Sequence, residues 1–194
     1  MKLLEKLNIH NYKFNSTERF HLEAEVTKQA YKVKETSLGD PNFVNFDLDE
    51  ILSDKNIEDI FNKIKLNSCS DVGDLNIPAH PETIYLTVVD KDLNSVSIIN
   101  SVCYVFGSGI TTNKSGILLH NRGTNFRVEH GHPNCIEGLK RPLHTIIPGM
   151  VIDKDNNTTL SYGVMGGQYQ PVGQVHVLNN MIDYGMGPQE ALSF

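Results

Sequence analysis

The chain has 194 residues, of which 39% are hydrophobic and 21% are charged, a balance that is ordinary for a folded globular domain and unlike that of a disordered segment. Its formal net charge of −6, with Lys and Arg scattered along the sequence, argues against nucleic acid as a partner. The three cysteines, Cys69, Cys103 and Cys135, show no CxxC spacing, so we expect reduced thiols and neither a disulfide framework nor a zinc site.

Neither a secretory signal nor a membrane span is expected. Met1 to Lys6 carry charges where a signal peptide has its apolar region, and no run approaches the roughly 20 apolar residues of a spanning helix. The sequence therefore predicts a cytoplasmic protein that does not bind a membrane.

A long helix is the first element expected. Residues 15–17 offer N-cap side chains, and apolar residues then recur at helical spacing from Phe20 to Val33. Gly39 suits a left-handed cap and Pro41 cannot continue a helix, so the helix should end just before them. A second, short helix is expected over Asn56–Lys65.

Residues 67–82 contain many turn residues and no periodicity. This composition indicates a flexible linker or, alternatively, an ordinary surface loop. The chain therefore divides into a helical region at 1–66, a linker at 67–82 and a region of strands and a helix at 83–194.

The pattern changes to alternation after the linker. Thr83–Val89 and Val96–Asn100 predict two strands that pair as a hairpin around a turn at 90–94. A later helix is expected over Pro171–Tyr184, closed by Gly185. Further strands are expected over three segments, Ser115–Leu119, Thr145–Asp153 and Thr159–Val164. Strands followed by a helix indicate an α+β fold in which helices cover a sheet.

Thr83 stands where the linker meets the first strand. A threonine hydroxyl is a weak nucleophile that needs a base, and its own α-amino group supplies one once the preceding peptide bond is cleaved. Under this hypothesis the cleavage site is the bond between Glu82 and Thr83. The alternative is that Thr83 only opens a strand, where threonine is common.

Several short motifs follow Thr83 in a fixed order. They are Asn100-Ser101, Phe106-Gly107-Ser108-Gly109, Ser115 to Gly123, Lys140 to Thr145 and Met165-Gly166-Gly167. In this order and spacing the chain resembles the γ-glutamyltranspeptidase family of N-terminal nucleophile hydrolases, from about Phe20 onward. The resemblance implies part of a four-layer αββα sandwich, with the end of the large subunit before Thr83 and the first part of the small subunit after it.

The resemblance also implies roles for single residues. Thr83 would be the catalytic nucleophile, Ser101 a hydroxyl that hydrogen-bonds it, and Gly166-Gly167 the backbone donors of an oxyanion hole. Substrate-binding positions fall on Cys103, Arg122, Asn125, His144 and Thr145. From the residues alone, Gly166-Gly167 reads as a turn and Ser101 as the end of a strand.

Three positions depart from the transpeptidase pattern. Relatives that bind the ammonium of a γ-glutamyl substrate carry Asp where this chain has Asn125, paired serines where it has His144-Thr145, and Asn where it has Cys103. Because an amide cannot neutralise an ammonium, Asn125 favours the acylase-like branch of the family and weak γ-glutamyl specificity.

His130 and His132 lie close in sequence but have no carboxylate or cysteine at metal-like spacing. The resembling family also uses no metal for catalysis. We therefore expect neither a metal nor a cofactor.

Three functions are open. The first is an autoprocessing γ-glutamyltransferase or hydrolase of glutathione-like amides. The second is an amidase or acylase with the same nucleophile and a different acyl group, and the third is a catalytically inactive remnant or fragment. Either enzyme would act on a small-molecule amide and would need the remainder of the large subunit as a partner.

Overall fold

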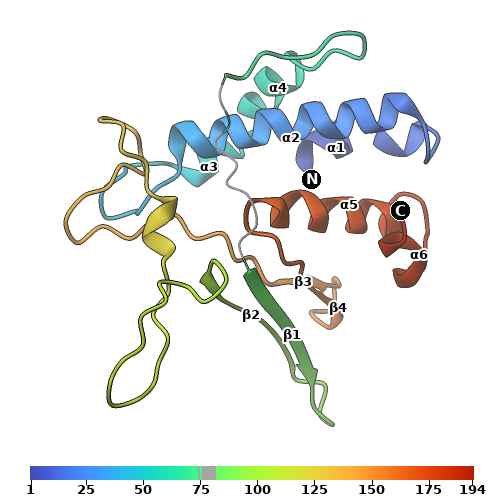
Figure 1. Ribbon diagram of the computed structural model, residues 1–194. Coiled ribbons are helices and arrows are strands. Elements are labelled where there is room, and N and C mark those ends of the chain that lie inside the picture. Colours follow the sequence, from blue (N-terminus) through green and yellow to red (C-terminus); the bar gives the residue numbers. More distant parts are fainter. Residues whose placement is uncertain (74, 76–81) are drawn as a thin grey trace. The chain divides into compact units, whose positions relative to one another are not determined.

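The structure, a computed structural model, describes residues 1–73, 75 and 82–194, apart from the side chain of Glu82 (Figure 1). Residues 74 and 76–81, which belong to the expected linker, lie outside the described part. The chain forms two compact units. The first consists of Met1–Asn76, Phe126–Leu143 and Val177–Phe194, and the second of Ile77–Asn125 and His144–His176.

The first unit is helical. It contains α1 (Lys2–Lys6), η1 (Ile9–Asn11), α2 (Thr17–Ser37), α3 (Leu48–Ile51), α4 (Asp54–Phe61), α6 (Pro188–Leu192) and the end of α5 (Gln170–Ile182). The long helix expected from the sequence is confirmed as α2. Ser16 caps α2 by accepting a hydrogen bond from the Arg19 amide (3.2 Å). Gly39 follows the helix at a point where a Cβ would collide with the carbonyl of Pro133.

The second expected helix is confirmed as α4, but its limits differ. It begins at Asp54 rather than at Asn56, because the Ser53 side chain caps it by accepting from the backbone N–H of residue 56 (3.2 Å). It ends at Phe61. The short helices α1, α3 and α6 were not predicted, because segments of four or five residues carry too little periodicity to recognise.

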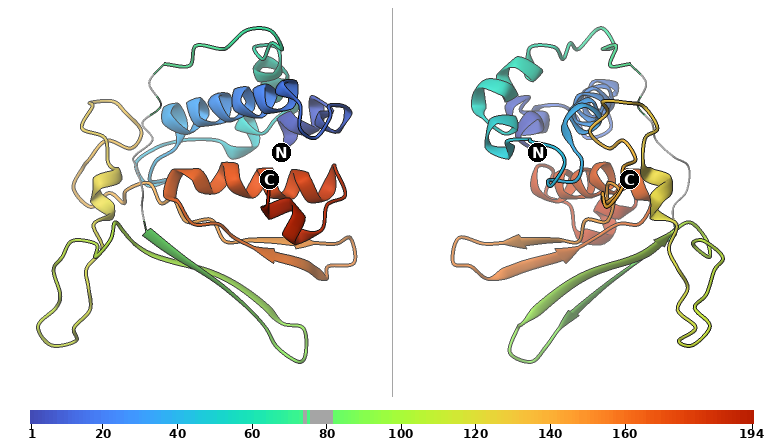
Figure 2. Two further views of the ribbon diagram at one scale, coloured as in Figure 1. Left: turned by 45° about the vertical axis from the view of Figure 1, so that its right-hand side comes forward. Right: turned by 90° about the vertical axis from the view of Figure 1, so that its left-hand side faces the viewer.

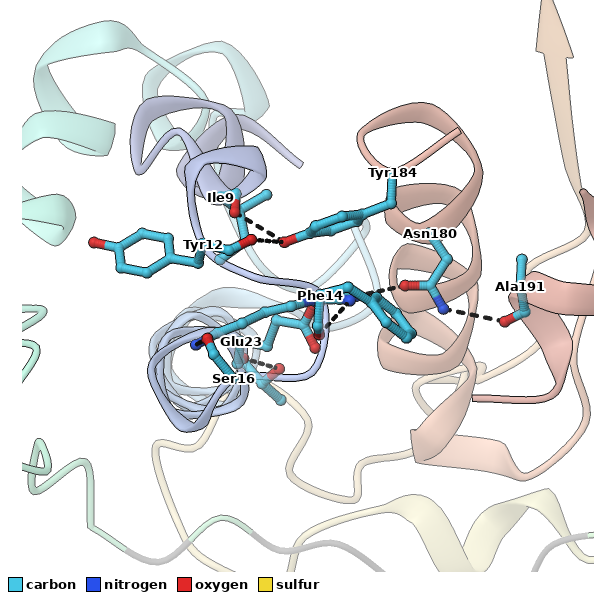
Figure 3. Close-up of polar contacts among 10 residues, drawn as sticks. Ile9, Tyr12, Phe14, Ser16, Glu23, Asn180, Tyr184 and Ala191 are labelled. Atoms are coloured by element: carbon cyan, nitrogen blue, oxygen red, sulfur yellow. Dashed lines mark hydrogen bonds and ion pairs between the residues drawn. The ribbon is translucent and has the colours of Figure 1, made fainter. Parts of the chain in front are cut away.

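A buried arginine joins α2 to the end of α5 within the first unit (Figure 3). The Arg19 side chain is fully buried and donates to the Glu23 carboxylate (2.8 Å) and to the Asn180 side-chain oxygen. The guanidinium carbon lies over two rings, 4.7 Å from the centroid of Phe14 and 4.4 Å from that of Tyr184. Since a buried cation is costly unless it is paired, these contacts hold the two helices together.

The second unit contains two β-hairpins. β1 (Glu82–Val89) pairs antiparallel with β2 (Ser95–Cys103), and β3 (Gly149–Ile152) pairs antiparallel with β4 (Thr158–Tyr162). Each pair is a separate two-stranded sheet, and the hairpins start close together and diverge toward their turns (Figure 2). The first hairpin is therefore confirmed, with β2 extending beyond its expected end at Asn100.

The two hairpins turn in the same way. The turns read Asp-Lys-Asp-Leu-Asn at 90–94 and Asp-Lys-Asp-Asn-Asn at 153–157. In each turn the first carboxylate accepts hydrogen bonds from the backbone N–H groups two and four residues later, at 2.8 and 2.9 Å for Asp90 and at 2.9 Å in both bonds for Asp153. Each turn is thus shaped by its own first residue.

The β1–β2 hairpin contacts β4 with one face. The Tyr85 hydroxyl lies 3.0 Å from the Ser161 hydroxyl, and Thr87 donates to the same oxygen (2.8 Å). Gly163 lies against Tyr85, where a Cβ would collide with the ring. The opposite face carries five apolar side chains that are 43–60% exposed, Ile84, Leu86, Val88, Val96 and Ile98. Alternation along paired strands places all of them on one side.

The strand expected at Ser115–Leu119 is wrong. This described segment forms a turn through Gly116, whose φ is +68°, and an isolated bridge joins Thr111 to Leu118. The Thr112 hydroxyl accepts from the N–H of Ile117 (3.0 Å) and shares a hydrogen bond with the Ser115 hydroxyl. These local bonds stabilise the turn, so the apolar run does not enter a sheet.

The strand expected from Thr145 begins only at Gly149. Before that point the backbone of Ile147 is bound by side chains of α5, since its N–H donates to Gln170 (3.0 Å) and its carbonyl accepts from Gln174. The expected last helix is confirmed as α5, with Gly185 beyond its end at a φ of +67°.

Helices and small antiparallel sheets together give an α+β fold, as the sequence predicts. In the described part of the chain, every helix is too short or too polar to cross a membrane.

Candidate active site

Thr83 lies near the start of β1, opposite a β-bulge in β2. The register pairs Glu82 with Cys103 and Ile84 with Asn100. Thr83 alone therefore faces the two residues at 101–102 of β2. Bulges redirect side chains and are frequent beside active sites. The expected nucleophile and the expected second hydroxyl, Ser101, thus come from opposite strands at the same irregular point of one hairpin.

A buried arginine brings other expected site residues together. Arg122, the first residue of η2 (Arg122–Asn125), is only 3% exposed. Its guanidinium donates to the Ser101 hydroxyl (2.9 Å) and to the Thr145 hydroxyl (3.0 Å). Within the described part of the chain, Arg122 forms no ion pair with a carboxylate. Three residues far apart in the sequence therefore meet around one positive charge.

Cys103 ends β2 in a strained backbone conformation. Its φ of +82° lies in the left-handed region, which costs a residue with a side chain roughly 1–3 kcal/mol. The Cys103 N–H donates to the Ser101 hydroxyl (3.0 Å), and the buried sulfur lies 3.8 Å from the Thr124 hydroxyl. Ser101 therefore accepts hydrogen bonds from both Cys103 and Arg122, which fixes the position of its oxygen.

Two histidines lie beside Arg122. The backbone N–H of Arg122 donates to Nδ1 of His120 (3.1 Å). Burial, and then the charges of Arg122 and His120, lower the pKa of His144. His144 is therefore neutral at pH 7, whereas the guanidinium stays charged.

Gly166 and Gly167 both adopt left-handed backbone, with φ values of +114° and +54°. They open η3 (Gly167–Tyr169), which leads directly into α5. Because neither residue has a Cβ, a ligand could approach the backbone N–H groups of this turn closely. Gly166-Gly167 belongs to the same compact unit as Thr83 and Arg122.

Two further residues that the sequence singled out, Asn125 and Glu82, lie in η2 and β1. Asn125 closes η2, three positions after Arg122. The backbone of Glu82 belongs to β1, while its side chain lies outside the described part.

Asn121 has a role that the sequence did not reveal. Its side-chain oxygen accepts from the N–H of Tyr104 (3.1 Å), and its own N–H donates to the carbonyl of Val102 (3.1 Å). Asn121 thereby ties the segment that carries Arg122 to the end of β2. The available signal was its place directly before Arg122 in the His-Asn-Arg-Gly motif.

Arg141, which belongs to the motif from Lys140 to Thr145, binds a carboxylate of the first unit. In the first unit its side chain donates to both oxygens of the Asp40 carboxylate, at 2.9 and 3.1 Å. These hydrogen bonds hold the pKa of Asp40 well below its usual range. The charge of Arg141 is therefore neutralised by Asp40.

The histidines considered as metal ligands also belong to the first unit, where Nε2 of His132 lies 3.4 Å from the Glu35 carboxylate. A different group of three possible ligands comes together on α2 and the segment after α4, with ligand atoms within 4.8 Å of one another, His21, Glu25 and Cys69. The Lys28 ammonium already binds the Glu25 carboxylate (2.8 Å) and supplies a cation there.

The sequence matches a model of a known protein family. A sequence model described as γ-glutamyltranspeptidase matches residues 1–193. The chain belongs to the γ-glutamyltranspeptidase family.

Relatives in the family carry several names. The chain is 34% identical over 198 residues to the glutathione hydrolase-like YwrD proenzyme of Bacillus subtilis, covering 100% of this chain and 36% of that protein. It is 30% identical over 173 residues to the oxamate amidohydrolase proenzyme of Klebsiella pneumoniae, covering 89% of this chain and 32% of that protein. The chain thus spans about a third of the length of the curated relatives that it matches.

Solved structures of this family have the same fold. The cephalosporin acylase from Bacillus halodurans matches with a TM-score of 0.81 and 32% identity over 99% of this chain and 35% of that chain. The γ-glutamyltranspeptidase from Pseudomonas nitroreducens complexed with L-DON matches with a TM-score of 0.51 and 30% identity, over 55% of this chain and 60% of that chain. The expected fold, part of the αββα sandwich of N-terminal nucleophile hydrolases, is confirmed.

Proposed function

We propose that this chain carries the processing site and the nucleophile of an amide-cleaving enzyme of the γ-glutamyltranspeptidase family. The protein cleaves itself between Glu82 and Thr83, and Thr83 then acts through its hydroxyl with its own amino group as base. The junction divides a region like the end of the large subunit, residues 1–66, from a region like the small subunit, residues 83–194. The remainder of the large subunit is needed as a partner.

The reaction is acyl transfer in two steps. Thr83 Oγ attacks the substrate carbonyl, its proton passes through the α-amino group to the leaving nitrogen, and the C–N bond breaks as an ester forms. Water, or an acceptor amine in a transferase, then attacks the ester and returns the proton to Thr83. The Gly166-Gly167 segment is the candidate for holding the oxyanion, where each donor contributes roughly 2.7–4 kcal/mol.

The single observation that carries the proposal is the position of Thr83 opposite the bulge at residues 101–102 of β2. The extra residue belongs to β2, so the bulge re-aims the side chains of β2, including that of Ser101, at the point that faces Thr83. Ser101, held by Cys103 and Arg122, supplies a hydroxyl at the same point. Names of relatives that include glutathione hydrolase and cephalosporin acylase support amide cleavage.

Intact-mass measurement of the complete protein that carries this chain tests the proposal. We expect two fragments, the second beginning at Thr83. Thr83→Ala removes the attacking hydroxyl and should leave one uncut species. Thr83→Ser is the matched control, since it keeps a hydroxyl and should still be cut.

Wild-type protein that stays uncut after prolonged incubation would argue against processing. Cleavage of Thr83→Ala at the same bond would equally remove Thr83 from the reaction. If neither cleavage nor hydrolysis of any acyl anilide is found in the complete protein, the third possibility, an inactive remnant, is correct.

A further inference from the structure

A nitrogen, a carboxylate and a sulfur come together on α2 in the first unit. His21 and Glu25 share one face of the helix because they lie four positions apart, and Cys69 comes from the segment after α4. Their ligand atoms lie within 4.8 Å of one another. The ligands of one tetrahedral zinc ion are roughly 3.3–3.8 Å apart, as bonds of 2.0–2.3 Å require. Small side-chain rotations therefore close the remaining distance.

The segment after α4 is held against α2 on both sides of Cys69. Nε2 of His21 lies 2.8 Å from the carbonyl of Lys65, and the backbone N–H of Ser70 donates to Oε2 of Glu25 (2.8 Å). Between these contacts an isolated bridge closes a tight turn that begins at Lys65. The backbone thus brings Cys69 to α2 without the help of an ion.

These contacts also prepare the side chains to bind a metal. An imidazole that donates through Nε2 to a backbone carbonyl keeps Nδ1 unprotonated, and metal-bound histidines usually have such a partner. A carboxylate ligand is likewise usually held by a hydrogen bond, as Ser70 holds Glu25. Glu25 is only 1% exposed, and a carboxylate buried to that degree needs a positive charge beside it.

Lys28 shows that a cation is favoured at this point. Its ammonium lies 2.8 Å from Oε1 of Glu25. The hydrogen bond to Glu25 raises the pKa of Lys28, and the negative charges of Glu25, Cys69 and Asp71 raise it further. The Lys28 side chain is 29% exposed, so it can turn to water when another cation takes its place.

We propose that His21, Glu25 and Cys69 form a zinc site that fastens the segment after α4 to α2. An imidazole nitrogen, a carboxylate oxygen and a thiolate are donors that suit zinc and not magnesium or calcium, and water fills the fourth position. On binding, the Cys69 thiol gives its proton to solvent, and the Lys28 ammonium leaves Glu25 with its own protons retained. Zinc binding here goes beyond the proposed function and does not depend on Thr83.

Calorimetric titration with zinc tests the site, in the complete protein after metals are removed with a chelator and thiols are reduced. Cys69→Ser removes the sulfur ligand from an exposed position. It should weaken zinc binding by more than the roughly 10- to 100-fold typical of losing an outer-shell partner. Cys135→Ser removes a half-buried thiol of the same unit and should leave the zinc affinity unchanged. Equal zinc affinity of wild type and Cys69→Ser overturns the site, and so does absence of binding.

Cobalt identifies the ligand directly. With Co²⁺ in place of zinc, wild type should show the charge-transfer absorption of a cobalt–thiolate bond, and Cys69→Ser should not. His21→Gln should bind cobalt more weakly than wild type. The full absorption in Cys69→Ser would assign the metal to another cysteine and overturn the site. Because Cys69 is exposed, its substitution decides the question even if the buried Glu25 does not tolerate replacement.

Lys28 provides a test that a merely structural ion pair would not pass. Lys28→Gln removes the competing ammonium and should tighten zinc binding. Lys32→Gln removes the same charge from an exposed position of α2 and should leave the zinc affinity near the wild-type value. Zinc affinity in Lys28→Gln that is no higher than in Lys32→Gln overturns the exchange of cations.

Discussion

The backbone angle φ of Gly167 limits which residues can replace this glycine. Gly167 is buried and has a φ of +54°, a conformation that β-branched residues strongly avoid. Gly167→Val should therefore displace the backbone N–H groups of the candidate oxyanion hole and lower turnover by roughly 10²- to 10³-fold. The measurement is kcat for an anilide substrate with processed protein, together with the melting temperature.

Gly116 supplies the control for strain alone. It has a similar left-handed φ of +68° and no atom within 4 Å of a Cβ placed on it. Gly116→Val should destabilise its exposed turn and leave kcat near the wild-type value. Near-normal turnover in Gly167→Val would remove Gly166-Gly167 from the site, and equal losses in both variants would point to stability as the cause.

Residue roles were predictable only where a motif carried them. Ser101, Arg122 and Thr145 were singled out by resemblance, yet nothing in the sequence showed that they touch, since 21 and 23 positions separate the bonded pairs. The left-handed backbone of Cys103 was equally hidden, because Cys is not a residue that signals such a conformation. Contacts of this kind depend on how the chain returns to β2.

For helices and strands, local sequence patterns predicted the structure correctly where no other contact of the same backbone competed with them. The capping side chain of Ser16 marked the start of α2, and the helix ends before Gly39 and Pro41 as expected, but it ends at an extended Leu38 and not in a left-handed glycine cap. The apolar run at 115–119 misled, because hydrogen bonds within its own turn outweighed its β propensity. The backbone of Ile147 likewise bound side chains of α5 that no local pattern reveals.

The helix α2 also holds a pH-sensitive contact. Glu25 is buried; its carboxylate accepts from Lys28 (2.8 Å) and from the backbone N–H of Ser70 (2.8 Å). Burial alone would raise the pKa of Glu25, but these hydrogen bonds outweigh it and lower the pKa to about 2. Because the folded-state pKa lies below the unfolded value, the contact stabilises the fold above about pH 4.5 and is lost as the pH falls from there toward 2.

Denaturant unfolding at pH 7 and at pH 3 measures this contribution. The free energy of unfolding of wild type should fall with pH more than that of Glu25→Gln, by up to roughly 2–3 kcal/mol. Glu18→Gln, at an exposed position of the same helix, should follow wild type. A Glu25→Gln protein with an undiminished pH dependence would show that other carboxyl groups govern acid stability.

For the whole molecule, the exposed apolar face of the β1–β2 hairpin has a measurable consequence. Because five apolar side chains share this face, the isolated 194-residue chain should bind a hydrophobic dye and increase its fluorescence. Replacing Leu86 and Ile98 with threonine should reduce the signal. Leu192→Thr, which removes an exposed leucine of α6, should not, and absence of dye binding in the wild-type chain would contradict the expectation.

The division of the chain into two compact units could not be predicted from the sequence, because it depends on contacts between distant residues. Residues 126–143 and 177–194 join the first unit through contacts such as Arg141 with Asp40 and Arg19 with Asn180, which bridge 101 and 161 positions. Alternation and helical periodicity are local and carry no information on such pairings. The α+β class followed from the order of elements, whereas the sandwich itself came only with the family resemblance.

The matching turns at 90–94 and 153–157 bear on the order of folding. Each is closed by contacts within five residues, and hairpins of this kind form within about 1–10 μs. The bond between Thr87 and Ser161 instead spans 74 positions and has to wait until both hairpins exist. We therefore expect each hairpin to gain its register early, and Thr83 to reach its place opposite the bulge in β2 before the two sheets meet.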